Sequence, residues 1–410
     1  MNDQKKSQLT VIFFTVFIYL VGFGVIIPIT PLLGKEFGAS SSQVGLLMSV
    51  YSLMQFLFSP FWGKISDRVG RRPVLLFCLL GEGASYLLFA ASRSLEVLFV
   101  ARALAGFFGA SLSTASAYIS DVTPPNERSK GMALIGAAFG LGFIVGPALG
   151  GGLTMWGEHI SPEPHFGTSF ALVMVAGICF ANFLFGVKFL KESLDKTHQI
   201  KPKDLSRIEQ ILHYFKKPLV GSLMWVFFIN SVAFSTMEAT LVLLVGDRFG
   251  WGIKEVSFGF AYIGVVSTIS QGLLVRRLLP KLGERKMLIL GLSCLAISLA
   301  GISMAKEIWE LAFVMTFLCL GYSFTSPSTL GSISLLSPAT EQGAVLGTTQ
   351  GLASLGRILG PAFGGLIYGI HQAAPFLSAA ALAGFAFLIV LMTYAQLPES
   401  AKQTAKKAHN

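Results

Sequence analysis

A ten-residue glycine-rich segment occurs twice in the chain, and this duplication constrains the fold more than any other feature. Gly142-Phe-Ile-Val-Gly-Pro-Ala-Leu-Gly-Gly returns 214 positions later as Gly356-Arg-Ile-Leu-Gly-Pro-Ala-Phe-Gly-Gly. A second patterned segment, Gly63 to Pro73, has a shorter copy at 282–286, in which Gly283 follows Gly70 by 213 positions. Because the chain has 410 residues, this repeat fills it and leaves no room for a separate catalytic domain. We therefore expect two similar halves with the function between them.

Composition places both halves in a membrane. Hydrophobic residues make up 53% of the chain and charged residues 13%, whereas soluble proteins average about 25% charged residues. Apolar runs of roughly 20 residues match the ~30 Å hydrocarbon core, and an isolated span satisfies its backbone in lipid only as a helix. We predict an all-α membrane protein with twelve spans: 9–33, 43–62, 74–91, 95–118, 131–153, 167–189, 218–245, 256–275, 287–305, 308–332, 343–369 and 374–396.

The spans divide the chain into three parts. We expect an N-terminal six-helix bundle at 1–189, a cytoplasmic linker at 190–217, and a C-terminal six-helix bundle with a short cytoplasmic tail at 218–410. Apolar residues at linker positions 205, 208, 211, 212 and 215 have the spacing of an amphipathic helix on a membrane surface. A solvated tether and a regulatory segment are both consistent with this pattern.

Lysine and arginine predict the orientation. When loops are counted alternately, 24 of the 31 Lys and Arg residues fall on one side, which the positive-inside rule makes cytoplasmic, together with both termini. The net charge of +10 then reflects topology and contact with anionic lipid, and we expect no nucleic-acid partner. The first span lacks a small-x-small cleavage site and resembles a retained helix rather than a signal peptide. Helical spans without a targeting peptide indicate a bacterial inner membrane.

The sequence offers no pattern typical of an enzyme or a metal site. No CxxC or Cys/His ligand spacing occurs, and no nucleophile, base and orienting group lie near one another. We therefore expect no enzymatic activity, no metal and no cofactor. All four cysteines fall within apolar spans: Cys78, Cys179, Cys294 and Cys319.

The loop from Gly63 to Pro73 resembles the signature of the major facilitator superfamily, and the resemblance covers all twelve spans. It implies two six-helix bundles, alternating access and a central substrate site. A short basic loop with one acid can form ion pairs that latch the cytoplasmic helix ends, whereas a merely positive loop is the alternative. The residues assigned to this latch are Gly63, Asp67, Arg68, Gly70, Arg71, Arg72 and Asp121.

The duplicated glycine segment resembles the antiporter motif of the drug:proton antiporter branch, with Ala133 in place of its leading glycine. Small residues at i and i+4 permit close helix contact, and proline bends the helix. The resemblance implies export, although a packing device shared by both halves would explain the second copy. The motif residues are Gly142, Gly146, Pro147, Gly150 and Gly151.

Further segments are similar to tetracycline-efflux proteins, but the transmembrane aspartates of that group are missing. Tyr51 to Pro60, Ala117 to Thr123 and Asp247 to Trp251 carry the similarity. Tyr19, Ser85 and about Leu295 stand where those proteins place aspartates. This difference favours a multidrug or tetracycline-like exporter of lipophilic or amphipathic compounds over one specific for tetracycline.

If protons drive transport, a carboxylate within the membrane must bind and release them. Glu82 and Glu238 are the candidates away from predicted helix ends. Burial in a low dielectric disfavours the ionised form, which suits a proton carrier, although structural pairing with an arginine is the alternative. The resemblance places the seventh helix on the cavity, so we prefer Glu238. Arg102 matches the fourth-helix arginine of the family, which implies an influence on proton transfer; snorkelling to the membrane surface is its alternative.

The expected substrate cavity combines scattered polar groups with adaptable apolar surface. Its candidate residues are Tyr19, Gln55, Trp225, Asn230, Met237, Gln271, Gln350 and Arg357, the last with a structural interbundle contact as an equal alternative. We predict a proton-coupled exporter of amphipathic small molecules, acting as a monomer in contact with lipid. The alternatives are an uptake symporter for a sugar, acid or metabolite, and a non-transporting membrane receptor or scaffold.

Overall fold

The computed structural model describes residues 3–123, 128–163, 165–194, 213–338, 341–393 and 395, and these residues form helices joined by short turns. Nine stretches within them are long and apolar enough to cross a membrane. One of these, Ile253–Met304, turns at Gly283 and so provides two spans. With α6 and α13, the described residues contain the twelve predicted spans. The linker helix expected at 205–215 lies almost entirely outside the described residues.

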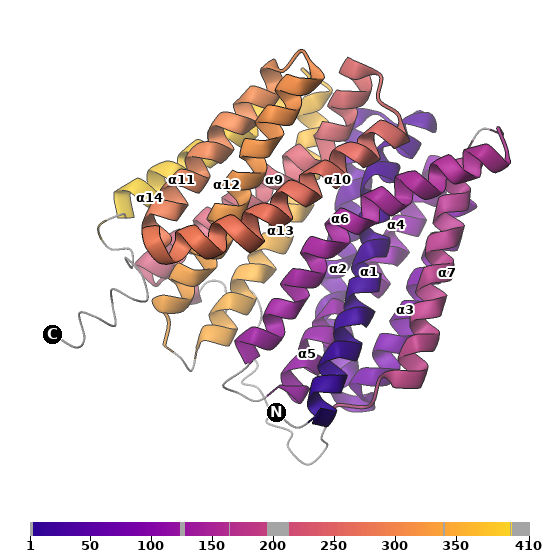
Figure 1. Ribbon diagram of the computed structural model, residues 1–410, viewed down its shortest axis with the longest axis horizontal. Coiled ribbons are helices and arrows are strands. Elements are labelled where there is room, and N and C mark those ends of the chain that lie inside the picture. Colours follow the sequence, from indigo (N-terminus) through magenta and orange to yellow (C-terminus); the bar gives the residue numbers. More distant parts are fainter. Residues whose placement is uncertain are drawn as a thin grey trace. The chain divides into compact units, whose positions relative to one another are not determined.

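The first compact unit comprises Met1–Lys201 and Val245–Gly264. Within it α1 runs along α6, and α3 packs against α7 (Figure 1). The helices of its first part are α1 (Asp3–Glu36), α2 (Ser41–Val69), α3 (Arg71–Ala90), α4 (Leu95–Gly109), α5 (Leu112–Val122), α6 (Arg128–Ile160) and α7 (Phe166–Phe189).

The second compact unit comprises Pro202–Leu244 and Val265–Asn410. In this unit α11 packs against both α12 and α14 (Figure 1). The helices that contribute to it are α9 (Pro218–Phe249), α10 (Ile253–Ile269), the π-helical segment η2 (Ser270–Val275), α11 (Arg276–Met304), α12 (Ile308–Leu335), α13 (Gln342–Tyr368) and α14 (Ala374–Thr393).

The fourth predicted span is broken between α4 and α5, which the sequence did not predict. In a continuous helix the carbonyl of Gly109 would accept the amide of Ser113. Here that carbonyl accepts hydrogen bonds from Tyr19 Oη and Gln55 Nε2, each at 3.2 Å. The Ser113 amide turns to the carbonyl of Ala110 instead, at 3.4 Å. Side chains from α1 and α2 thus hold the break open.

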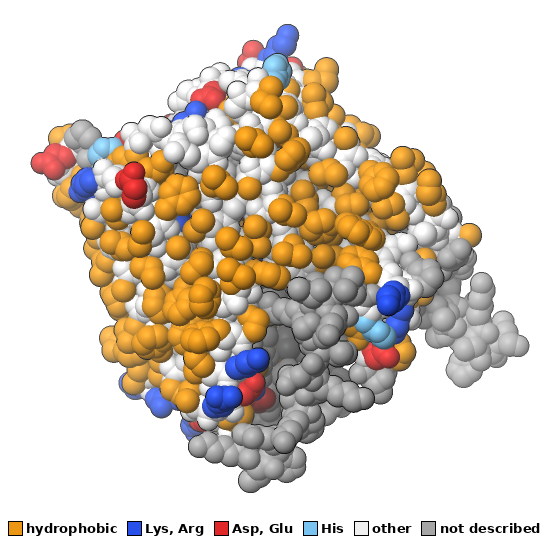
Figure 2. Space-filling model, turned by 180° about the vertical axis from the view of Figure 1, so that it is seen from behind, with side chains coloured by type: hydrophobic (Ala, Val, Ile, Leu, Met, Phe, Trp, Pro, Cys, Tyr) orange, Lys and Arg blue, Asp and Glu red, His pale blue; other side chains and the backbone are white. Residues whose placement is uncertain are grey.

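The outer surface is as apolar as a lipid-facing surface must be. Figure 2 shows a face on which hydrophobic side chains predominate and charged side chains lie near the margins. The exposed side chains include Phe77, Leu184, Phe258, Ile297 and Phe313, each more than half exposed. A soluble protein rarely exposes apolar patches of this extent, so the surface fits a protein solvated by acyl chains.

Candidate functional site

The basic loop between α2 and α3 is a network of ion pairs and caps within the first unit. Arg71 pairs with Asp67 and with Asp121, the latter at 3.2 Å, and donates to Ser66 Oγ at 2.6 Å. Gly70 has φ 114°, in the region that favours glycine. Arg71 is buried, so its charge is neutralised by the two carboxylates rather than by solvent.

Glu192, which the sequence did not single out, completes this network. Its carboxylate accepts the backbone amides of Arg71 and Arg72 at 2.8 and 3.1 Å and so caps the start of α3. Arg72 in turn donates to the carbonyl of Val187 at 2.7 Å. Arg68 is exposed, and a Cβ atom at Gly63 would meet no described atom within 4 Å. The latch residues therefore fall into two groups. One forms the network of ion pairs and hydrogen bonds around Arg71, and the other, Arg68 and Gly63, makes few side-chain contacts in this unit.

The two glycine segments occupy equivalent places. In the first unit, a Cβ atom at Gly146 would lie 2.6 Å from the Cα of Gly24 on α1, and Gly142 and Gly150 face Leu20 and Val25. Beyond them, Gly151 faces Ser257. In the second unit, a Cβ atom at Gly360 would lie 2.7 Å from the carbonyl oxygen of Val232 on α9. Each segment thus lets the fifth span of a half touch the backbone of the first.

Tyr19 belongs to a buried polar cluster at the break between α4 and α5. Its hydroxyl lies 2.7 Å from that of Tyr51, and the Arg102 guanidinium lies 4.8 Å from the centre of the Tyr51 ring. Gln55 joins the cluster through the Gly109 carbonyl. Arg102 is 3% exposed, so it does not snorkel to the surface. The cluster therefore holds the Arg102 guanidinium over the face of the Tyr51 ring within the membrane-spanning helices.

Glu82 is 1% exposed and accepts a hydrogen bond from Tyr86 Oη at 2.8 Å. It also interacts electrostatically with Tyr19. One half of the chain thus holds a buried carboxyl group beside a cluster that contains an arginine. Tyr51 and Tyr86, which link these groups, were not among the predicted site residues, because their partners are brought close only by the packing of the helices.

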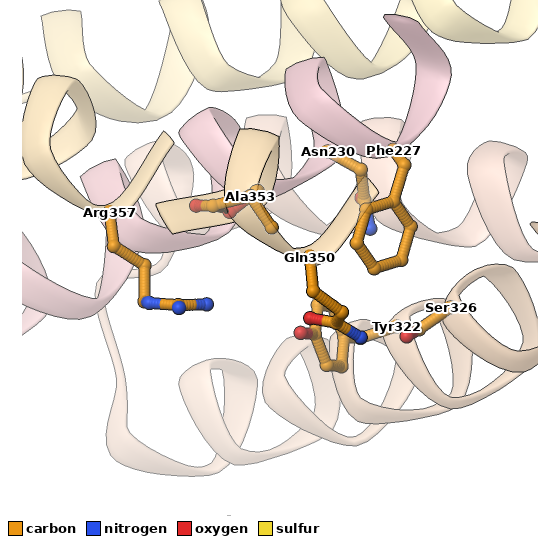
Figure 3. A pocket seen from close by; sticks show the side chains of 8 residues that line it. Phe227, Asn230, Tyr322, Ser326, Gln350, Ala353 and Arg357 are labelled. Atoms are coloured by element: carbon orange, nitrogen blue, oxygen red, sulfur yellow. Dashed lines mark hydrogen bonds between the residues drawn. The ribbon is translucent and has the colours of Figure 1, made fainter. Parts of the chain in front are cut away.

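The second unit contains a polar cavity of about 90 Å³. Figure 3 shows Gln350, Ala353 and Arg357 along one face of α13, with Gln350 directed towards Tyr322 of α12. Of the predicted cavity residues, Asn230, Gln350 and Arg357 meet here. The remaining lining residues are Phe227, Ser231, Tyr322, Ser326 and Ala353. Spacing could have revealed them, since Tyr322 and Ser326 are one turn apart, as are Phe227 and Ser231.

Arg357 is the charged member of the cavity lining. One of its terminal nitrogens donates to Ser354 Oγ at 2.8 Å. Tyr322 stacks on Phe234 of α9 with ring centres 4.2 Å apart. Glu238 is half-buried on α9, two turns from Ser231 and on the same helix face.

The other five predicted cavity residues lie elsewhere: Tyr19 and Gln55 belong to the cluster in the first unit, and the remaining three join neither group. Trp225 is 48% exposed and packs against Phe215 and Phe228 rather than lining the cavity. Met237 is buried in the helix packing, and Gln271 is exposed on η2. In the described part of the chain, no group of three or more His, Cys, Asp or Glu side chains could hold a metal ion.

Comparison with known proteins gives a family and close relatives. The family model described as Major Facilitator Superfamily matches residues 12–321 and 272–409. The tetracycline resistance protein, class B, of Escherichia coli is 31% identical over 90% of this chain and 89% of its own length. Multidrug resistance protein 2 of Bacillus subtilis is 29% identical over 95% of this chain and 94% of its own length.

A solved structure matches the whole length of the fold. The crystal structure of the human organic anion transporter MFSD10 (TETRAN) aligns with a TM-score of 0.70 and 26% identity, covering 95% of this chain and 100% of that one. The similarity thus extends over both halves in sequence and in three dimensions.

Proposed function

The chain belongs to the major facilitator superfamily, and from this premise we propose that it exports amphipathic small molecules from bacterial cells in exchange for protons. The protein is a transporter embedded in the membrane. Relatives named as tetracycline and multidrug resistance proteins, similar over nearly the whole chain, support drug efflux and disfavour both uptake and a receptor role.

One observation carries the proposal: Glu238 lies on the face of α9 that lines a polar cavity within a membrane-spanning unit. We propose that this carboxylate binds and releases the coupling proton. A proton arriving from outside and a substrate arriving from inside then compete for one site. Alternating access converts this competition into exchange, with the proton gradient as driving force and no cofactor.

We propose that the basic loop acts as the conformational latch. We propose that both termini are cytoplasmic, so that the Asp67–Arg71–Asp121 network lies at the cytoplasmic side and rearranges as the protein changes state. We further propose that the protein works as a monomer in direct contact with lipid, because each half contains its own carboxyl group and its own arginine within the membrane-spanning helices.

The test is proton movement in proteoliposomes with an imposed pH gradient, to which lipophilic cations, tetracyclines and sugars are added in turn. Export predicts proton flux down the gradient, opposite to drug movement, that is triggered by amphipathic compounds and lost in Glu238→Gln. Flux of drug and proton in the same direction would make the protein an importer. A fully active Glu238→Gln would move the proton site to Glu82, which Glu82→Gln would then check.

A further inference from the structure

The cavity in the second unit is lined by polar side chains from α9, α12 and α13. Asn230 is 2% exposed, and no hydrogen bond joins its side chain to another residue in the described ranges. Tyr322 and Ser326 are half-buried and Gln350 is exposed, and no hydrogen bond joins their side chains to another residue in the described ranges either. Four polar side chains that face one cavity without pairing to one another provide a place for a polar guest or for water.

The chemistry of the lining selects the guest. Each of these four side chains can both donate and accept a hydrogen bond, whereas the Arg357 guanidinium carries donors only, one of which is used by Ser354 Oγ. Ser231 is occupied, because it donates to the carbonyl of Ala353 at 2.8 Å. A lining with one cation among groups that can donate suits an acceptor of negative charge, such as a carboxylate or an enolate, which a guanidinium binds in a bidentate manner.

The size of the cavity limits how much of the guest enters it. The cavity has a volume of about 90 Å³, well below the ~300–1,000 Å³ of pockets that enclose a drug-sized ligand. It therefore accommodates a charged end group and not a complete drug-sized molecule. The rest of the molecule must extend out of the cavity.

The position of Glu238 indicates where a second charge of the ligand, a positive one, would lie. Helices α9 and α13 run parallel, because Gly356 packs on Ser231 and Gly364 on Thr240. Arg357 is thus nearly level with Ser231, and Glu238 lies six or seven residues further along α9, roughly 10 Å at 1.5 Å per residue. A ligand that reaches from Arg357 to Glu238 would need an acidic group at one end and a basic group at the other.

We propose that the cavity is a head-group subsite for the acidic end of a bipolar amphiphile, whose basic end is bound by Glu238. This inference rests on the proposed exchange of drug for protons. A basic group and a proton compete for the Glu238 carboxylate, as exchange requires. A purely anionic compound would instead be repelled by the ionised carboxylate and favoured by its protonation, which would couple drug and proton in the same direction.

A matched set of three compounds tests the proposal: 4′-(aminomethyl)biphenyl-4-carboxylic acid, its methyl ester and its N-acetyl derivative. Binding to the purified protein in detergent is measured by calorimetry, which does not depend on transport. The bipolar compound is expected to bind at least tenfold more tightly than either derivative. Arg357→Gln should abolish its advantage over the ester, and Glu238→Gln its advantage over the N-acetyl compound.

Control variants separate charge recognition from general damage. Arg357→Lys keeps the charge and should retain part of the preference, whereas Arg276→Gln removes an exposed cation of the same unit and should change nothing. Asn230→Ala and Gln350→Ala should weaken binding of the bipolar compound more than that of the ester, even if Arg357→Gln does not fold. Equal binding of all three compounds, binding of none, or an equal loss for all three in Arg357→Gln would each overturn the proposal.

The outcomes also distinguish this proposal from export itself. If the ester drives proton release as well as the bipolar compound does, export stands and the head-group subsite is wrong, and the cavity holds water only. If the bipolar compound binds selectively but moves no protons in proteoliposomes, the subsite stands and proton-coupled export fails.

Discussion

Individual side chains in this protein form hydrogen bonds with buried polar groups, which lipid chains cannot do. Tyr86 provides the hydrogen bond recorded for the Glu82 carboxyl group, which is almost completely buried. Tyr86→Phe would leave that group without its donor, at a cost of about 1–3 kcal/mol. Thermal unfolding in detergent should therefore show a lower Tm. The double variant Glu82→Leu/Tyr86→Phe should lose less than the two single changes added together, since it leaves no carboxyl group to satisfy. Additive losses would show that the pair is not coupled.

Two glycines of the basic loop make a second, matched comparison. Gly70 has φ 114° and lies against the Glu192 carboxylate, so Gly70→Ala is both strained and crowded and should cost about 1–3 kcal/mol. Gly63 lies within α2 with no described atom near its Cβ position, so Gly63→Ala should stabilise the protein by about 0.5–1 kcal/mol. Thermal unfolding decides the signs. A stable Gly63→Ala that has lost transport would indicate that Gly63 is needed for movement and not for folding.

The packing of whole helices against one another depends on the close approach of their backbones at glycine. Gly146→Ala would place a methyl group against the backbone of Gly24 and should cost about 1–3 kcal/mol through overpacking. Gly140→Ala, one and a half turns earlier on α6, meets no described atom and serves as the control. The comparison is made by thermal unfolding of both variants. If both are equally stable, α1 and α6 are not held by this contact.

The helices also show what sequence can and cannot predict. Hydrophobic runs located the spans to within a few residues at most ends, because the bilayer imposes their length and composition. The break after Gly109 was not predictable, since it arises from hydrogen bonds that Tyr19 and Gln55 donate from distant parts of the chain. Among cavity residues, Asn230 and Gln350 were predicted because polar groups are rare in apolar helices. Tyr322 was missed, although its spacing of one turn from Ser326 places both on one face of α12.

Because the chain is a duplication, its two halves share features of helix packing and of buried charge. In each half the fifth span approaches the first through glycine, and in each half a carboxyl group and an arginine lie in the membrane interior near tyrosines. The differences carry the specificity: the first half surrounds its charges with packed aromatic rings, whereas the second leaves a cavity beside Arg357. We therefore expect substrate recognition to depend more on changes in the second half.

The orientation of the chain in the membrane can be tested directly. The distribution of Lys and Arg predicts that the loops holding Arg93 and Glu307 lie outside the cell, and that Lys64 and Lys286 lie inside. Cysteine placed at each exposed position is treated with a membrane-impermeant maleimide in intact cells, with the wild type as control because its four cysteines lie in membrane helices. Arg93→Cys and Glu307→Cys should react at once, and Lys64→Cys and Lys286→Cys only after permeabilisation. The reverse pattern would contradict the orientation. It would place the Asp67–Arg71–Asp121 network outside, where it could not serve as a cytoplasmic latch, and would reverse the predicted direction of transport.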